Sequence, residues 1–192
     1  MLKLSSARPL LALMCLSACM ETAHTAPPPQ AAPVGLPRGF VRTDGHGDLV
    51  ISAGGAARCE QATAVEKAAT LAASNAARAR SGLAPLSIHP TLQRVAEKMA
   101  CEMARRGTMT HVSTDGGRPG PRIKAAGYRP ALTTENIAAG RMDLGRVMAE
   151  WTRSPDHLSN VVRPGLRHMG IGHATGSDGK TVYWSAIYAQ PR

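Results

Sequence analysis

Residues 133–160 read TTENIAAGRMDLGRVMAEWTRSPDHLSN. The first part, Thr133 to Ala139, is expected to be extended. The next part places its apolar residues on one side of a helix from Leu144 to Trp151. After Pro155, which is tolerated in a first helical turn, a further turn or helix is expected to carry His157 to Val162. This stretch therefore predicts a strand followed directly by helical structure.

Two longer helices are expected upstream of this stretch. Residues 60–80 are rich in alanine at helical spacing, and Gly82 is a typical residue at a helix end. A second helix is expected after Pro90, with an apolar stripe from Leu92 to Met103 that is typical of a core-facing side. Gly107 is expected to end this second helix.

The remaining elements complete the predicted fold. A shorter helix is expected from Pro119 to Ala126. Residues 169–174 and 182–188 predict a terminal hairpin across the turn sequence Ser177-Asp178-Gly179. Because helices precede and flank an antiparallel sheet, the expected fold class is α+β.

The N-terminus predicts export. Residues 1–18 are interpreted as a signal peptide, with basic residues before an apolar run that is too short to cross a bilayer. Leu16-Ser17-Ala18-Cys19 resembles the lipobox of bacterial lipoproteins. This resemblance predicts a lipid on Cys19 and attachment to a membrane surface, which in a two-membrane bacterium would be the outer membrane. The alternative is an ordinary signal peptide that is cut later, near Ala23 to Ala26.

The predicted mature chain has two parts. Residues 19–58 are rich in proline and alanine and are interpreted as a tether, in which Leu49 to Ser52 is a candidate for a short strand. Residues 59–192 are expected to form the folded domain. In an oxidising compartment, Cys59 and Cys101 suggest one disulfide. If both lay on neighbouring antiparallel helices, however, they would sit at different distances from the connecting loop.

The chain has a formal net charge of +10, which suits anionic partners such as lipid head groups or cell-wall polymers. Nucleic acid is not an expected partner, because the few aromatic residues are not interleaved with basic ones.

Three residues are the main candidates for chemistry: His111, Glu135 and His157. Two imidazoles and a carboxylate can bind a divalent metal such as zinc and leave a position open for water, which would allow hydrolysis. The same residues can equally form a hydrogen-bonded network that holds a cleft together. No His-x-x-x-His spacing presets a metal site on one helix, so both alternatives stay open.

An ordered set of motifs resembles the CAP superfamily, which comprises cysteine-rich secretory proteins, antigen 5 and pathogenesis-related 1 proteins. The motifs are Asn75-x-x-Arg78, Gly82-Leu83-x-Pro85-Leu86, His111, Gly127-Tyr128, Glu135-Asn136-Ile137-Ala138, Trp151-x-x-Ser154-Pro155-x-His157-x-x-Asn160, Gly170-Ile171-Gly172 and Tyr183-Trp184. The chain is most similar to the bacterial SCP-like extracellular branch of this superfamily.

The resemblance implies an α-β-α sandwich with a shallow cleft lined by two histidines and two acids, with which divalent metals are associated. His111, Glu135 and His157 match three of these positions, and Asn136 adjoins them. Ser154 occupies the place of the second acid.

The leading hypothesis is an exported, lipid-anchored binding module at the cell envelope rather than an enzyme. Its ligand would be a lipid, a cell-wall component or an envelope protein. The alternative is a metal-dependent hydrolase that uses His111, Glu135 and His157.

Overall fold

The computed structural model describes residues 40–42, 45 and 47–192. The predicted signal peptide, the predicted lipid site at Cys19 and the tether as far as residue 39 lie outside the described residues. Among the described residues, no helix has the length and the apolar character needed to cross a bilayer.

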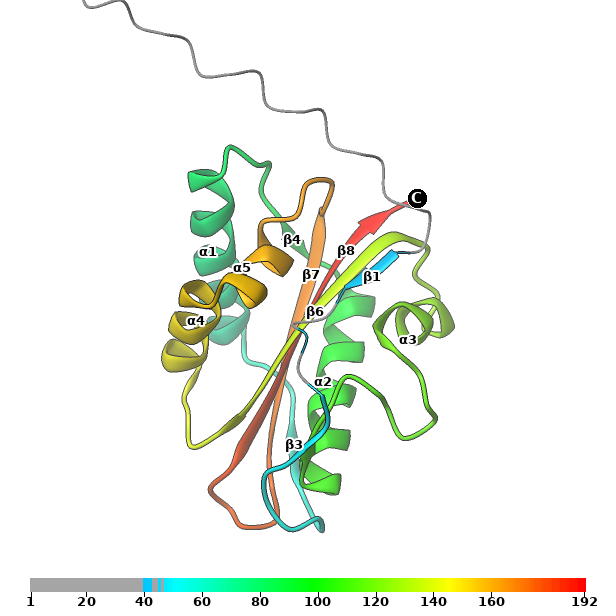
Figure 1. Ribbon diagram of the computed structural model, residues 1–192, viewed down its shortest axis with the longest axis vertical. Helices are drawn as coiled ribbons and strands as arrows, with labels where there is room; N and C mark the ends of the chain where they lie inside the picture. The colour runs from blue at the N-terminus through cyan, green and yellow to red at the C-terminus, as the bar shows by residue number, and fades with distance from the viewer. Residues whose placement is uncertain (1–39, 43–44, 46) are drawn as a thin grey trace, which may run out of the picture. The chain divides into compact units, whose positions relative to one another are not determined.

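The centre of the fold is a sheet in which the strands follow the order β1-β6-β8-β7-β3, with β4 beside β7 (Figure 1). These strands are β1 (Phe40–Arg42), β3 (Arg58–Glu60), β4 (Ser87–Ile88), β6 (Pro130–Gly140), β7 (His168–Thr175) and β8 (Val182–Pro191). The pairs β6–β8, β7–β8 and β3–β7 are antiparallel, whereas β1 and β4 join parallel to β6 and β7. The predicted strand at 133–139 and the predicted terminal hairpin are confirmed.

Helices cover both faces of this sheet (Figure 1). One face carries α1 (Ala64–Arg80), α4 (Leu144–Arg153) and α5 (Pro155–Val161), and the other carries α2 (Pro90–Arg106) and α3 (Pro119–Ala125). The predicted α+β class and the α-β-α arrangement are therefore confirmed.

Local signals explain where the two long helices begin and end. Thr63 accepts a hydrogen bond from the backbone N–H of Glu66, whose side chain accepts in return from the Thr63 backbone, so α1 begins with a capping box. The His89 side chain caps α2 by accepting from the N–H of Thr91. Gly107 ends α2 in the left-handed conformation, with a φ of 66°.

Alternation along β8 divides its side chains between the two faces of the sheet. Tyr183 and Ile187 face α2 and pack into the cores beneath it. Trp184, Ala186 and Tyr188 face the other way, into the core under α1, α4 and α5. Because β8 is buried on both faces, it reads as a nearly continuous apolar run in the sequence.

The Gly170-Ile171-Gly172 motif lets α2 lie directly against β7. A Cβ atom at Gly170 would lie 2.3 Å from the backbone carbonyl carbon of Leu92, and one at Gly172 would lie 2.4 Å from the backbone of Glu97. Neither position has room for a side chain. The two glycines therefore allow the close approach of this helix to the sheet.

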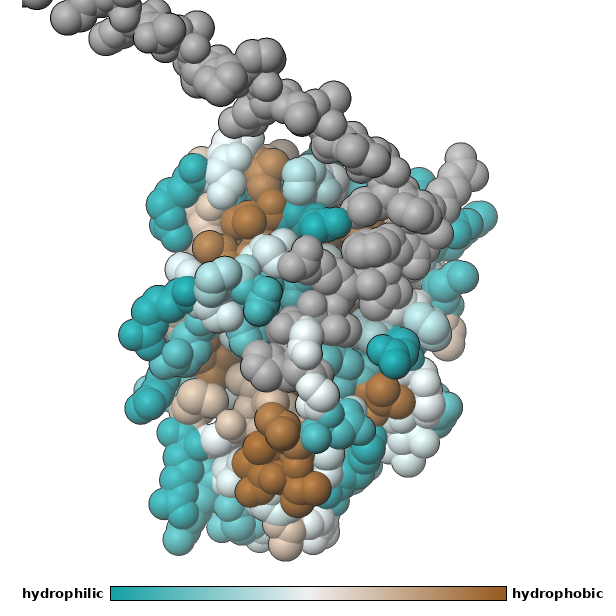
Figure 2. All heavy atoms as spheres, viewed as in Figure 1, coloured by the Kyte–Doolittle hydropathy of each residue, from teal (hydrophilic) through white to brown (hydrophobic). Residues whose placement is uncertain are grey.

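Strand pairing also extends into the stretch that the sequence assigns to the tether. The segment Phe40–Arg42 pairs with residues 132–134 of β6. The short strand β2 (Leu49–Val50) pairs antiparallel with β5 (Thr108–Met109), where the sequence indicates a candidate strand. Figure 2 shows hydrophobic surface gathered over the cyan segment that precedes β3, among hydrophilic side chains.

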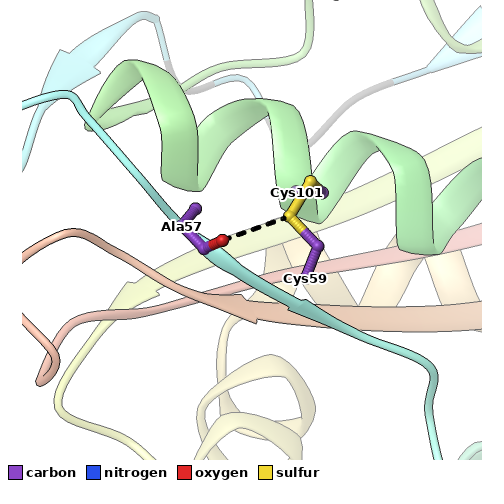
Figure 3. Close-up of a disulfide and its surroundings, with 3 residues drawn as sticks. All are labelled: Ala57, Cys59 and Cys101. Atoms are coloured by element: carbon purple, nitrogen blue, oxygen red, sulfur yellow. Dashed lines mark hydrogen bonds between the residues drawn. A yellow bond between two sulfur atoms is a disulfide. The ribbon is translucent and has the colours of Figure 1, made fainter.

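The predicted disulfide between Cys59 and Cys101 is confirmed, with a Cα–Cα distance of 5.1 Å (Figure 3). The geometry differs from the two-helix arrangement considered above, because Cys59 lies on strand β3 and only Cys101 lies on a helix, α2. Strand β3 runs beside α2, so the two cysteines meet without the difference in distance from a connecting loop that two helices would have. Joining cysteines that are 42 residues apart contributes about 4 kcal/mol in the chain-entropy model.

Candidate functional site

Glu135 lies on β6 with its side chain fully buried. One carboxylate oxygen, Oε2, lies 2.7 Å from Nδ1 of His111. The other, Oε1, accepts from the guanidinium of Arg122 and from the hydroxyl of Ser185 on β8, the latter at 3.3 Å. A buried carboxylate is stable only when charge and hydrogen bonds compensate it, and these three side chains do so.

Arg122 connects this carboxylate to the loop before α3. Its second terminal nitrogen donates to the carbonyl oxygens of His111 at 2.7 Å and Gly117 at 3.0 Å. The side chain is only 9% exposed. The triad of Arg122, Glu135 and His111 therefore holds the loop after β5 against both the sheet and α3.

Asn136 follows Glu135 on the same strand, so its side chain points to the opposite face of the sheet. Its amide nitrogen donates to the carbonyl oxygen of His157 at 3.1 Å, and its amide oxygen accepts from Asn160 at 2.9 Å. Asn160 also donates to the carbonyl of Glu135, and Thr134 donates to the carbonyl of Asn160 at 2.8 Å. These bonds attach α5 to β6.

The imidazole of His157 contacts residues at the junction of α4 and α5. Its Nδ1 lies 2.8 Å from the hydroxyl of Ser154, and its ring stacks on Trp151 with the centroids 6.4 Å apart. Trp151 in turn donates from Nε1 to the carbonyl of Ile137 at 3.3 Å. The His157 ring is thus placed by its own helix boundary and by the core tryptophan.

The predicted site residues therefore form two groups. His111 and Glu135 touch directly, on the α2–α3 face of the sheet. Asn136, Ser154 and His157 contact one another or the same helix, α5, on the α4–α5 face. The backbone of β6 connects the two groups, since Asn160 binds both the carbonyl of Glu135 and the side chain of Asn136.

The described residues do not fit the metal site for which the sequence supplies candidates. In the part of the chain that the structure describes, no three His, Cys, Asp or Glu side chains are grouped closely enough to hold a metal ion. The carboxylate of Glu135 is already paired with the guanidinium of Arg122, which supplies the positive charge that a metal would bring. The alternative of a zinc-dependent hydrolase finds no support in this geometry.

A cavity of about 210 Å³ lies beside the triad. Its lining is apolar at Val95, Met99, Ala125 and Ala126 and polar at Lys98, Glu102, Ser113, Asp115 and Arg122. Hydrogen bonds from the Ser113 hydroxyl and, second, from the Gly117 N–H lower the pKa of the Asp115 carboxyl below its usual range. The cavity therefore combines an apolar wall with acidic and basic side chains. It suits a small apolar group that carries a charge at one end.

Sequence reasoning did not identify Arg122 and Ser185 as site residues, because neither stands in a recognisable motif. One physical signal was available for Arg122. A glutamate within a buried strand needs a cationic partner, and Arg122 lies in the predicted helix that precedes this strand. Ser185 becomes a neighbour of Glu135 only through the pairing of β6 with β8.

Comparison with known proteins agrees with this fold. The model of the family described as CAP, the cysteine-rich secretory protein family, matches residues 71–188. The uncharacterized protein YkwD of Bacillus subtilis (strain 168) is 32% identical over 99 residues, which are 52% of this chain and 38% of that protein. The chain thus spans less than half the length of this curated relative.

Solved structures of similar fold include an outer surface protein from Borrelia burgdorferi, with a TM-score of 0.61 and 24% identity, covering 68% of this chain and 96% of that one. An extracellular protein containing an SCP domain from Bacillus anthracis str. Ames has a TM-score of 0.58 and 21% identity, covering 66% of this chain and 40% of that one. At these identities, the similarity supports the fold alone.

Proposed function

Because the chain belongs to the CAP, or cysteine-rich secretory protein, family, we propose that it is an exported binding module at the cell envelope, anchored by a lipid on Cys19. The proposed ligand site is the cavity beside the triad of Arg122, Glu135 and His111. One observation carries this proposal. Glu135, the acid of the cleft motif, accepts a hydrogen bond from Arg122, and Arg122 itself lines the cavity.

The size and lining of the cavity limit the ligand. A volume of about 210 Å³ is below the range of about 300–1,000 Å³ that is usual for whole small-molecule ligands. The site is therefore expected to take one small group of a larger molecule. The acids Glu102 and Asp115 and the ammonium of Lys98 can select a charged end, while Val95 and Met99 contact an apolar stem. A residue of a peptide-bearing wall polymer or of an envelope protein has this form.

Filling the cavity tests the proposal. Ala125 is exposed at the last turn of α3 and lines the cavity, so Ala125→Phe is expected to block ligand entry without disturbing the core. With purified peptidoglycan sacculi as the probe, sedimentation should show at least about tenfold weaker binding for this variant, since it loses the apolar contact of the ligand.

Ala68→Phe is the matched control, because Ala68 is exposed on α1, on the opposite face of the sheet. It should bind sacculi like the wild type. Equal binding by Ala125→Phe and the wild type would exclude the cavity as the wall-binding site. Zinc analysis of the same preparations tests the hydrolase: stoichiometric zinc that disappears in His157→Ala would favour it over a binding module.

The lipid anchor has its own test. Cells that express the full chain and are fed an alkyne-bearing fatty acid are expected to label it, and Cys19→Ser should abolish the label and release the protein from the membrane fraction. A Cys15→Ser chain serves as the control, because Cys15 lies within the predicted signal peptide. Undiminished labelling of Cys19→Ser would refute the anchor.

A further inference from the structure

An apolar patch lies on the surface at β2, and none of its residues lines the candidate ligand cavity. Leu49, Val50 and Ile51 are consecutive in sequence and are 46%, 82% and 39% exposed. They are three of the four large hydrophobic residues that are exposed in the described part of the chain, and Val65 is the fourth. This clustering is unlike the scattered single apolar residues that are normal on a protein surface.

The backbone holds this patch in place. Strand β2 pairs with β5, and the N–H groups of Ile51 and Ser52 both donate to the carbonyl of Gly107, at 2.9 and 3.1 Å. The N–H of Gly55 donates to the carbonyl of Arg105 at 2.9 Å. The patch is therefore fixed to the C-terminal end of α2 although its side chains contribute little to the core.

Positive charge adjoins the patch. Arg105 and Arg106 are exposed in the last turn of α2, next to the strand that pairs with β2. The acid Asp48 also adjoins the patch, where it accepts a hydrogen bond from the hydroxyl of Thr110, so the two arginines outnumber the acid. An apolar patch beside exposed arginines, on a chain whose residues 19–192 have a formal net charge of +8 (21 basic minus 13 acidic residues), is complementary to an anionic lipid surface.

We propose that Leu49, Val50 and Ile51 dock the domain onto an anionic phospholipid bilayer, with Arg105 and Arg106 against the head groups. This inference rests on the proposed location at the envelope. Cys19 precedes strand β1 by 21 residues, and a chain of that length reaches at most about 75 Å from the folded domain. A lipid on Cys19 and the β2 patch can therefore engage the same membrane surface. The second contact would hold the folded domain itself against the membrane to which the lipid attaches the chain.

Vesicle co-sedimentation tests the docking. The protein is residues 19–192, which contain every described helix and strand, with Cys19→Ser so that no lipid contributes. The vesicles are phosphatidylethanolamine with phosphatidylglycerol, a composition chosen for its negative charge, or phosphatidylcholine alone. This protein, with no change in the patch, is the wild type of the comparison and is expected to sediment with the anionic vesicles. Val50→Asp should weaken this binding at least about tenfold. The variant loses the apolar side chain that would insert into the bilayer and gains a negative charge that the anionic head groups repel.

Two variants serve to separate the parts of the surface. Val65→Asp is the matched control, since Val65 is 77% exposed on α1, outside the patch, and this variant should bind like the wild type. Arg105→Gln should weaken binding to anionic vesicles about fivefold and leave binding to phosphatidylcholine unchanged, because it removes one charge near the lipid head groups.

The outcomes distinguish this inference from the proposed function. Equal binding by Val50→Asp and the wild type, or no binding by the wild type, overturns the docking surface. Either outcome leaves the lipid-labelling and sacculus-binding tests of the proposed function unaffected. Light scattering tests the alternative that a second copy of this chain covers the patch. A wild-type dimer that Val50→Asp converts to a monomer would make the patch a contact between two copies and overturn the membrane assignment.

Discussion

Replacing Arg78 with alanine is expected to lower the free energy of unfolding by about 4 kcal/mol or more, which is a large fraction of the stability of a typical domain. Arg78 is fully buried in α1. Its guanidinium donates to the carbonyl oxygens of Ala84 at 2.8 Å, Val161 at 2.8 Å, Arg163 at 3.0 Å and Leu166 at 3.2 Å.

The expected loss is large because one side chain serves three separate segments. It joins the turn after α1, the end of α5 and the loop before β7. Each buried carbonyl that loses its donor costs about 1–3 kcal/mol. The side chain is 0% exposed, and this burial, and second the charge of Arg167, lower the pKa of Arg78. Its backbone hydrogen bonds compensate for this loss of hydration.

Denaturant unfolding followed by circular dichroism measures the effect. Arg78→Lys should also destabilise strongly, because a single ammonium cannot reproduce the planar fork that contacts four carbonyls. Arg80→Ala, two residues along the same helix and exposed, is the control and should change stability by less than about 0.5 kcal/mol. Similar midpoints for Arg78→Ala and Arg80→Ala would contradict the role assigned to Arg78.

The second large effect is expected at Glu135. Glu135→Ala should cost about 3–5 kcal/mol, because it leaves the buried guanidinium of Arg122 without its counter-charge and removes the partner of His111. The loop from residue 110 to 118 should then lose its attachment to the sheet. Hydrogen exchange is expected to show faster opening of the amides in this loop and in α3 than in α1.

A surface ion pair of this chain provides the matched control. On α4, a guanidinium nitrogen of Arg153 lies 2.6 Å from Oε1 of Glu150, and the side chains of Glu150 and Arg153 are 47% and 71% exposed. Glu150→Ala should therefore cost less than about 1 kcal/mol. If Glu135→Ala were as stable as Glu150→Ala, the triad would not be a structural network, and a role for Glu135 toward a ligand would become the better interpretation.

Much of the fold could be predicted from local patterns. The strand at 133–139, the helix at 144–151 and the terminal hairpin follow from apolar periodicity and turn residues that act over a few positions. Asn75 of the Asn75-x-x-Arg78 motif both donates to and accepts from the backbone of Leu86, so this motif fixes the turn after α1. Strand β1 was not predicted, because it is held by pairing with a strand about 90 residues away rather than by a pattern of its own.

The site was less accessible to sequence reasoning. The motif around Glu135 predicts a buried acid. Which basic side chain pairs with that acid depends on which helix lies over that face of the sheet. Adjacent residues on a strand point to opposite faces, so the single pairing register of β6 sends Glu135 toward Arg122 and Asn136 toward α5. The predicted strand already places the two side chains on opposite faces, but the sequence order of the candidates does not indicate which helix covers each face.

By itself the sequence determined the family, the helices and the three long strands, the pair of cysteines and the residue types available for a cleft, because each of these depends on short-range patterns or on motifs in fixed order. Only the tertiary structure decided that Arg122 neutralises Glu135, that Cys59 reaches Cys101 from a strand, and that Leu49 to Ile51 stay on the surface. These outcomes depend on long-range pairing. Contacts between residues that are far apart in the chain are set by the packing of whole layers, and no local pattern encodes them.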